Sequence, residues 1–548
     1  MAGGAALARR AGRHPELPRR ADQGRRELVL LHLTNGTVWT GDRFAASLTI
    51  EGNRIAAVDA PAPAGARTID LRGRFAMAGF IDNHVHFVNG GLDLSRVQLR
   101  DAASAGEFSS RVAAHARRLG EGQWVTGGGW DEYSWTPYGA PERRLLDHVE
   151  NPVFVTRADM HMGLANGRAL QLAGITRETP DPPGGTIVRD AQGEPTGLLK
   201  DAAMPLMFAV LPPPTIEERM AAARAALAEA ARSGVTSLCD MGMTPEAFDD
   251  FRAYQRLDRE GALTARINLY TPIGAYRRIQ DAGIEKRFGS GRLRIGGLKG
   301  FADGSLGSAT AAFHDPFADD PHNHGLVMRE MSDGSMAQWV ADADGHDLHI
   351  ALHAIGDKAN DEVLSIFEAR PDTRARRFRI EHAQHLNPSL IERFGRSGVI
   401  ASMQPHHAID DGRWAETKIG RERAQTMYAF RSLLDAGAIV TFGSDWTVAP
   451  LNPLTGVYAA VTRRTLDGKH PGGWIPEQKI TVEEALRCYT IHNAYALFAE
   501  HQLGRLEPGF LADVTVLAES PFDVEPERLR EIGIEMTIVD GEIVYAAP

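Results

Sequence analysis

The sequence has little cysteine, no long apolar run and no excess of positive charge, and each absence excludes a class of protein. Only Cys239 and Cys488 occur in 548 residues, too few for a disulfide framework or a cysteine-based zinc site. A reducing cytoplasm is therefore the expected location. No apolar run approaches a membrane span, and a net charge of -11 is unlike that of a general nucleic-acid binder. We expect neither a membrane nor a nucleic acid as partner.

The N-terminal 26 residues differ from the rest of the chain in composition. They are rich in arginine and poor in apolar residues. No apolar segment follows the arginines that could serve as the core of a signal peptide. We interpret residues 1–26 as a disordered tail, or as the result of a start codon assigned too early, rather than as a targeting peptide.

Both ends of the remaining chain have the pattern of short strands joined by turns. Residues 27–76 contain apolar runs separated by Gly, Asn and Asp, and residues 502–548 repeat this style. Asp540 and Gly541 stand between two apolar runs, which is a strong signal for a tight hairpin turn. We therefore predict one small β-sandwich domain built from both chain ends.

The middle of the chain, residues 77–501, alternates apolar strands with helical stretches. Eight segments have the pattern of strands: "GFIDNHVHF", "GVTSLCDMG", "ARINLYTPI", "RIGGLKGFADG", "HIALHAIGD", "RFRIEHAQH", "VIASMQPHH" and "AIVTFGSDW". Eight parallel strands with helical crossovers predict an α/β fold, a (β/α)₈ barrel of the TIM type. The interval from strand one to strand two is too long for one crossover, so we expect an inserted subdomain over about residues 92–232.

Polar residues follow the predicted barrel strands where each strand ends, which is where such barrels carry their chemistry. His84 and His86 lie on one face of strand one because strand side chains alternate with period two. Further strand ends offer Lys299, His353, His382 and Asp445. Imidazole and carboxylate groups are the usual ligands of zinc-like ions. The pattern favours a divalent-metal site over a coincidence of core histidines.

Lys299 is unusual in an apolar strand because a buried lysine is costly. It could pair with an acid such as Asp303. Alternatively, its deprotonated amine could add carbon dioxide and become a carbamate, an anionic ligand able to bridge two cations. Sequence spacing alone does not distinguish these interpretations.

Two segments of the inserted subdomain contain candidate substrate contacts. "GGGWDEYSW" is either a glycine-rich turn with packed tryptophans or a pocket wall that contributes Trp130 and Asp131. "RADMHMGLAN" offers Arg157 and His161, which resemble pocket residues of a known enzyme subgroup, with a buried salt bridge as the competing explanation for Arg157.

Other polar residues stand near the same strand ends. Glu381 adjoins His382 but points to the opposite face of its strand, so we expect it to support the site rather than to catalyse. His385 and the pair His406 and His407 either bind a substrate oxyanion or lie at the surface. Of these, we take His406 as the candidate substrate contact.

The chain resembles the amidohydrolase superfamily, and in detail the YtcJ-like subgroup that includes N-substituted formamide deformylases. The matching segments include "GFIDNHVHF", "GGGWDE", "LKGFADGSLGSATAAF", "HAIGD", "RIEHAQH", "GSDW" and "GRLEPGFLADVTVL". The resemblance implies a metal-dependent hydrolase. It assigns His84 and His86 to one metal, His353 and His382 to a second, and Lys299 to a carbamate bridge. It also assigns Asp445 to catalysis.

These observations predict an enzyme that hydrolyses an amide-type carbon–nitrogen bond of a small molecule, such as an N-substituted formamide. One or two divalent ions, zinc by preference, would activate water, and Asp445 would act as general base and then general acid. Asp445 could also be a plain metal ligand. The alternatives are a deaminase of a ring amine and a non-catalytic scaffold. The oligomeric state stays open, with a homodimer as one candidate.

Overall fold

A computed structural model describes residues 30–130, 132, 135–157, 162–182, 185–201, 203–242 and 246–548. The predicted tail, residues 1–26, lies outside these ranges. Within them, no helix is both long and apolar enough to cross a membrane.

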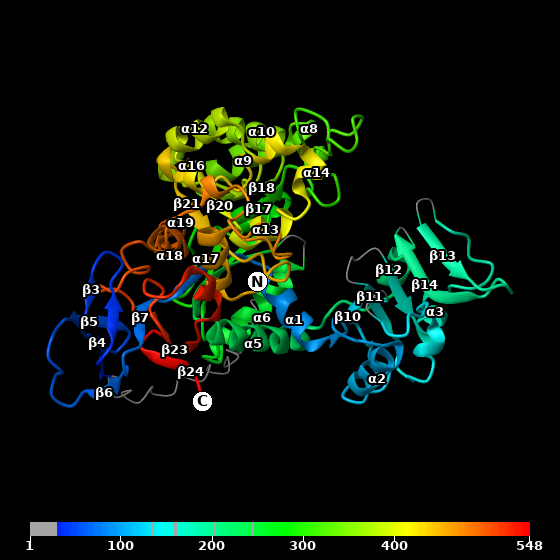
Figure 1. Cartoon of the computed structure of the whole chain (residues 1–548), viewed down its shortest axis with the longest axis horizontal. Helices are drawn as coiled ribbons and strands as arrows, with labels where there is room; N and C mark the ends of the chain where they lie inside the picture. Colours follow the sequence, from blue (N-terminus) through cyan, green and yellow to red (C-terminus); the bar gives the residue numbers. More distant parts are fainter. Residues whose placement is uncertain are drawn as a thin grey trace, which may run out of the picture.

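An eight-stranded parallel sheet forms the centre of the molecule and curves into a nearly closed barrel (Figure 1). Its strands are β8 (Phe80–Val85), β15 (Val235–Met241), β16 (Arg266–Pro272), β17 (Leu293–Phe301), β18 (Ile350–Ala354), β19 (Arg379–His382), β20 (Ile400–Met403) and β21 (Val440–Phe442). The first and last strands approach each other where Val85 forms a parallel bridge with Trp446. The predicted barrel and all eight of its strands are confirmed.

Small residues allow the helical layer to pack closely beside the first barrel strand. Helix α5 (Ile216–Arg232) begins with a capping box in which Thr215 and Glu218 satisfy each other's backbone N–H groups. Its alanine-rich face packs against α1 (Phe87–Ser95). A Cβ atom at Gly91 would lie 2.0 Å from the Ala222 carbonyl oxygen, so only glycine permits this approach. The contact fixes α1 directly behind the end of β8.

Two further sheets lie beside the barrel, one built from N-terminal strands and one from strands of both chain ends (Figure 1). One has the order β5-β4-β1-β6, with β5 (Arg54–Val58), β4 (Leu48–Glu51), β1 (Leu30–Thr34) and β6 (Arg67–Asp70). The other has the order β24-β23-β22-β7-β2-β3, which includes β2 (Thr37–Trp39) and β3 (Phe44–Ala45). Its C-terminal strand β22 (Val514–Leu517) pairs with N-terminal strand β7 (Phe75–Ala78). Between β23 (Ile534–Val539) and β24 (Glu542–Ala546), Asp540 and Gly541 both have positive φ, as the predicted tight turn requires.

The inserted segment after α1 forms a third sheet, which projects from the side of the barrel (Figure 1). Its order is β13-β14-β12-β11-β10-β9. The strands are β9 (Val97–Gln98), β10 (Gly127–Trp130), β11 (Phe154–Arg157), β12 (Met162–Ala165), β13 (Gly185–Arg189) and β14 (Pro195–Asp201). A core of its own includes Phe108, Trp130 and Trp135. Helix α5, which the predicted interval 92–232 includes, instead packs in the helical layer of the barrel.

Candidate metal centre

The six predicted metal ligands meet at the carboxyl end of the barrel. They line one cavity of about 530 Å³. They come from β8 and the residue between β8 and α1, from β17, β18 and β19, and from the segment after β21, and they are His84, His86, Lys299, His353, His382 and Asp445. Residues up to 361 positions apart, from His84 to Asp445, thus line one cavity, as their positions at strand ends predicted.

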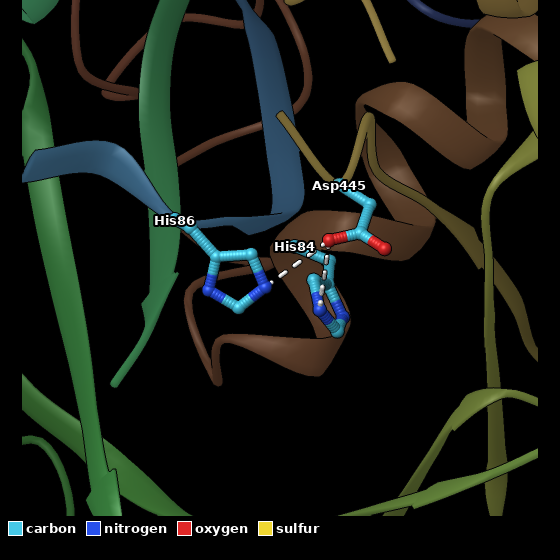
Figure 2. A group of neighbouring side chains, drawn as sticks. All are labelled: His84, His86 and Asp445. Atoms are coloured by element: carbon cyan, nitrogen blue, oxygen red, sulfur yellow. Dashed lines mark ion pairs between the residues drawn. The ribbon is translucent and has the colours of Figure 1, made fainter. Parts of the chain in front are cut away.

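His84, His86 and Asp445 form one of two groups in the cavity whose ligand atoms lie close enough to hold a metal ion (Figure 2), and the other is His382, His407 and Asp445. Asp445 Oδ1 lies 3.6 Å from His84 Nε2 and 3.2 Å from His86 Nε2. Asp445 has a left-handed backbone with φ of 57°, and its N–H donates to the His84 carbonyl oxygen at 2.7 Å. A strained backbone of this kind, which costs about 1–3 kcal/mol, persists where its surroundings enforce it. Here it directs the carboxylate to the two imidazoles.

Hydrogen bonds at the far side of each ring fix the tautomers of His84 and His86. Nδ1 of His84 lies 2.6 Å from Glu381 Oε2, and Nδ1 of His86 lies 3.1 Å from the Met241 carbonyl oxygen. A carboxylate and a carbonyl only accept, so each Nδ1 carries the hydrogen and each Nε2 presents a lone pair to the cavity.

These lone pairs face a carboxylate, which is unfavourable unless a cation lies between them. Burial lowers the pKa of His84 to about 4, so its ring is neutral near pH 7. Burial opposes ionisation of Asp445, but positive charge at the neighbouring imidazoles would hold the pKa of Asp445 well below its ordinary value, and around neutral rings a bound cation would supply that charge. Asp445 Oδ1 has no hydrogen-bond partner among the described residues. Imidazole nitrogens around an unsatisfied carboxylate oxygen fit a divalent ion.

A second group of imidazoles lies beside the first. The rings of His353 and His382 are 4.5 Å apart between centroids. Nε2 of His353 lies 2.9 Å from the Gly304 carbonyl oxygen, so its Nδ1 keeps a free lone pair. Nδ1 of His382 is buried and, in the part of the chain that is described, has no hydrogen-bond partner. These ring nitrogens leave His353 and His382 available as ligands, and a second ion on them stays a prediction.

Lys299 lines the same cavity as both groups of histidines and is buried, with 2% of its surface exposed. Burial lowers the pKa of Lys299 to about 8, although the charges of Glu381 and Asp445 oppose this shift. The Asp303 carboxylate, its suggested partner, accepts hydrogen bonds from three backbone N–H groups, those of Ala312, Ile355 and Gly356. A lowered pKa favours the neutral amine that carbamate formation requires.

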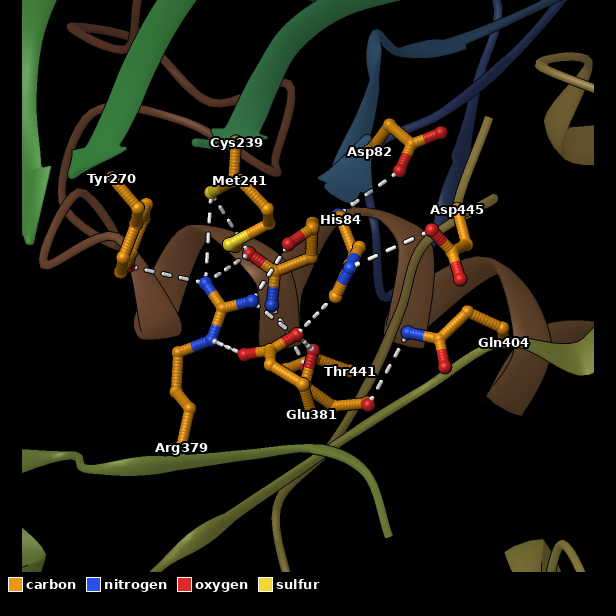
Figure 3. A network of polar contacts seen from close by, with 12 residues as sticks. Asp82, His84, Cys239, Met241, Tyr270, Arg379, Glu381, Gln404, Thr441 and Asp445 are labelled. Atoms are coloured by element: carbon orange, nitrogen blue, oxygen red, sulfur yellow. Dashed lines mark hydrogen bonds and ion pairs between the residues drawn. The ribbon is translucent and has the colours of Figure 1, made fainter. Parts of the chain in front are cut away.

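A network of buried polar groups supports His84 from inside the barrel (Figure 3). Glu381 accepts from Arg379 Nε at 2.7 Å and from the Ser402 hydroxyl at 2.8 Å, in addition to its contact with His84. Arg379 also donates to the Asn83 carbonyl and side-chain oxygens, at 2.6 and 2.9 Å. Glu381 therefore positions the His84 ring, as groups behind metal-bound histidines commonly do.

The sequence interpretation missed Arg379. The residue stands two positions before Glu381, hence on the same face of a strand whose four residues are all buried. Two oppositely charged residues two positions apart in a buried strand are the sequence feature that could have identified Arg379 as part of the site.

Helix α13 (Pro405–Asp411), which follows the seventh barrel strand, carries the neighbouring histidines His406 and His407. His407 lines the cavity, and its Nε2 lies 3.9 Å from Asp445 Oδ2. Among the described residues, neither His406 nor His385 contributes to the lining of this cavity. The structure thus brings His407 to the metal centre, one residue from the contact that the sequence suggested.

The predicted contacts from the inserted subdomain lie elsewhere or outside the described residues. Trp130 is completely buried and packs against Phe108 and Trp135 in the core of the inserted sheet. Arg157 forms an ion pair with Glu132, at 2.9 Å, that is mostly buried, as the competing explanation expected. Asp131 and His161 lie outside the described residues. A substrate contact by any of these four residues stays a prediction.

Comparison with known proteins identifies the family. The profile of the amidohydrolase family matches residues 67–545. The chain belongs to the amidohydrolase family. Protein LONG AFTER FAR-RED 3 of Arabidopsis thaliana is 39% identical over 538 residues, which cover 94% of this chain and 91% of that protein. YtcJ of Bacillus subtilis is 32% identical, covering 87% of this chain and 90% of YtcJ.

Two further amidohydrolase relatives bear on the chemistry. N-substituted formamide deformylase of Arthrobacter pascens is 29% identical, with 95% of this chain and 98% of the deformylase covered. An uncharacterized metal-dependent hydrolase from Pyrococcus horikoshii has a crystal structure with a TM-score of 0.77 at 30% identity, covering 91% of this chain and 99% of that one. The predicted resemblance to the YtcJ-like group is confirmed, and the chain is a member of the metal-dependent amidohydrolases.

Proposed function

We propose that this amidohydrolase hydrolyses an amide-type carbon–nitrogen bond in a small molecule, with an N-substituted formamide or a related amide as substrate. The observation that supports the proposal most strongly is the set of free imidazole lone pairs around Asp445 in one open cavity. The 29% identity to N-substituted formamide deformylase over nearly the whole chain supports the choice of bond.

The residues divide into those that hold metal and those that move protons. His84, His86 and Asp445 Oδ1 would hold one divalent ion, zinc by preference, and His353 and His382 a second, with Lys299 as a carbamate bridge. Ions bound there supply a Lewis acid for the carbonyl and lower the pKa of water to about 7. Asp445 would accept a proton from the attacking water and return it to the leaving nitrogen, as general base and then general acid.

The walls of the cavity offer space for an apolar substituent. Phe301, Leu306, Ile355 and Trp414 line it together with polar Asn89. An apolar wall with a few polar groups is typical of small-molecule sites.

The test is hydrolysis by the metal-loaded protein of a panel of N-formyl, N-acyl and cyclic amides, with ring amines as the competing class. We expect release of an amine from at least one amide and loss of that activity after chelation. Turnover of ring amines alone would identify a deaminase. No turnover by protein of full metal content would favour the non-catalytic scaffold.

A further inference from the structure

His407 occupies a position that the assignment of metal ligands leaves unexplained. It stands in the first turn of α13, directly after β20, and faces the cavity. Its ring is nearly parallel to that of His382, at an angle of 12° with centroids 6.2 Å apart. Asp445 thus points Oδ1 to His84 and His86 and Oδ2 to His407.

The Nε2 atom of His407 is buried and has no hydrogen-bond partner in the described part of the chain. Its 3.9 Å separation from Asp445 Oδ2 is too long for a hydrogen bond. Buried polar atoms without a partner are rare in native structures, and each calls for an explanation such as an unseen ligand.

The charge of Asp445 determines how the His407 ring presents this atom. A lone pair directed at a carboxylate is repelled, whereas an N–H is attracted. A ring with hydrogen on Nε2 would direct that N–H into the space beside Asp445, where an acceptor would have to come from a bound molecule. A ring with the lone pair on Nε2 would instead complete the group of His382, His407 and Asp445, which could hold a metal ion, and the experiment below separates the two.

An amide offers one good acceptor. Its nitrogen lone pair is delocalised into the carbonyl group, so the carbonyl oxygen takes the hydrogen bond. Negative charge also develops on this oxygen when water adds to the carbonyl carbon. Donors placed at that position commonly contribute the largest single part of catalysis.

We propose that His407 is a further catalytic residue, which donates a hydrogen bond from Nε2 to the carbonyl oxygen of the substrate as that oxygen becomes negative. This inference rests on the proposed amide hydrolysis. It selects His407 from the neighbouring pair on α13, because that side chain reaches the space beside Asp445.

The experiment compares His407→Ala, His407→Gln and His406→Ala with the wild type, all loaded with zinc. Three quantities are measured in each preparation: zinc content, kcat and KM for the best amide of the panel, and the Kd of methylphosphonate by calorimetry. Methylphosphonate is a tetrahedral oxyanion that resembles the product of water addition.

We expect His407→Ala to retain its zinc and to lose about 10²- to 10³-fold in kcat. Its affinity for methylphosphonate should fall about 10- to 100-fold, the contribution of a hydrogen bond to a charged group. His407→Gln keeps an N–H donor and should recover part of both losses. His406→Ala should lose less than His407→Ala in each measurement.

Several results would overturn the proposal. Loss of zinc from His407→Ala would make His407 a metal ligand, and unchanged kcat and Kd would make it a wall residue. A larger loss at His406 would reverse the assignment. If the wild type hydrolyses no amide, the proposed function fails, yet methylphosphonate still tests His407. A wild type that does not bind methylphosphonate contradicts the oxyanion contact.

Discussion

Replacing Glu381 by glutamine tests whether the buried network prepares His84 for metal. Glu381 accepts hydrogen bonds from His84 at 2.6 Å, Arg379 at 2.7 Å and Ser402 at 2.8 Å. Glutamine has one acceptor oxygen in place of two. Its amide N–H₂ group, if directed at His84 Nδ1, favours the tautomer with hydrogen on Nε2, which blocks the lone pair needed by the ion.

The expected size of the effect follows from these contacts. Loss of a group behind a metal-bound histidine weakens metal binding by about 10- to 100-fold, or about 1.4 to 2.8 kcal/mol. Arg379 would also lose the charge of its buried partner, and breaking such a pair costs about 3–5 kcal/mol. Zinc affinity is measured by competition with a chromophoric chelator, and stability by urea unfolding of the metal-free protein.

Glu500→Gln is the matched control. Glu500 pairs with Arg377 through two side-chain hydrogen bonds, and the cavity lining, as far as the chain is described, does not include it. Its replacement should leave zinc affinity unchanged. The reasoning about the His84 tautomer is refuted if folded Glu381→Gln binds zinc as tightly as the wild type.

Four further predictions concern single residues. Asp445→Asn should keep the fold and at least one ion but lose about 10²- to 10⁴-fold in kcat. The measurement is kcat, KM and metal content in one preparation, and an unchanged kcat would exclude Asp445 as the base. Lys299→Ala should lose metal occupancy, partly restored by a short carboxylic acid, and full occupancy in elemental analysis would exclude a bridging role. Trp130→Ala should destabilise the inserted sheet by about 3–5 kcal/mol in thermal unfolding without changing metal content, whereas metal loss would connect Trp130 to the centre. Burial holds the pKa of His349 at about 3, so protonation of the unfolded state opposes folding as pH falls from about 6.5 toward 3. The wild type should therefore lose about 2 kcal/mol more than His349→Gln between pH 7.5 and 5 in urea unfolding, and equal pH dependence would contradict a neutral buried His349.

The barrel and the gathering of the six candidate ligands in one cavity could be predicted because both follow from local patterns and one geometric rule. Apolar runs alternating with helical segments indicate parallel strands with crossovers, and the carboxyl ends of such strands meet at one face. His84 and His86 followed from period two within a single strand. No knowledge of long-range contacts was needed to place Lys299 and Asp445 at the same end of the barrel.

Other features depend on contacts that no local pattern specifies. His406 and His407 are adjacent, and which one faces the cavity depends on how α13 leaves β20. The partners of Arg379 include Asn83, almost 300 positions away, and depend on closure of the barrel. Trp130 could pack inward or line a pocket, and only the core of the inserted sheet distinguishes the two.

The most direct test of the central claim is the metal content of the purified protein, measured by elemental analysis beside hydrolysis of the best amide. We predict about two equivalents of zinc or a similar ion, on the logic of paired-metal sites. Chelation should remove both the metal and the activity, and zinc, manganese or cobalt should restore them. Full hydrolysis by protein that contains no metal would contradict the account.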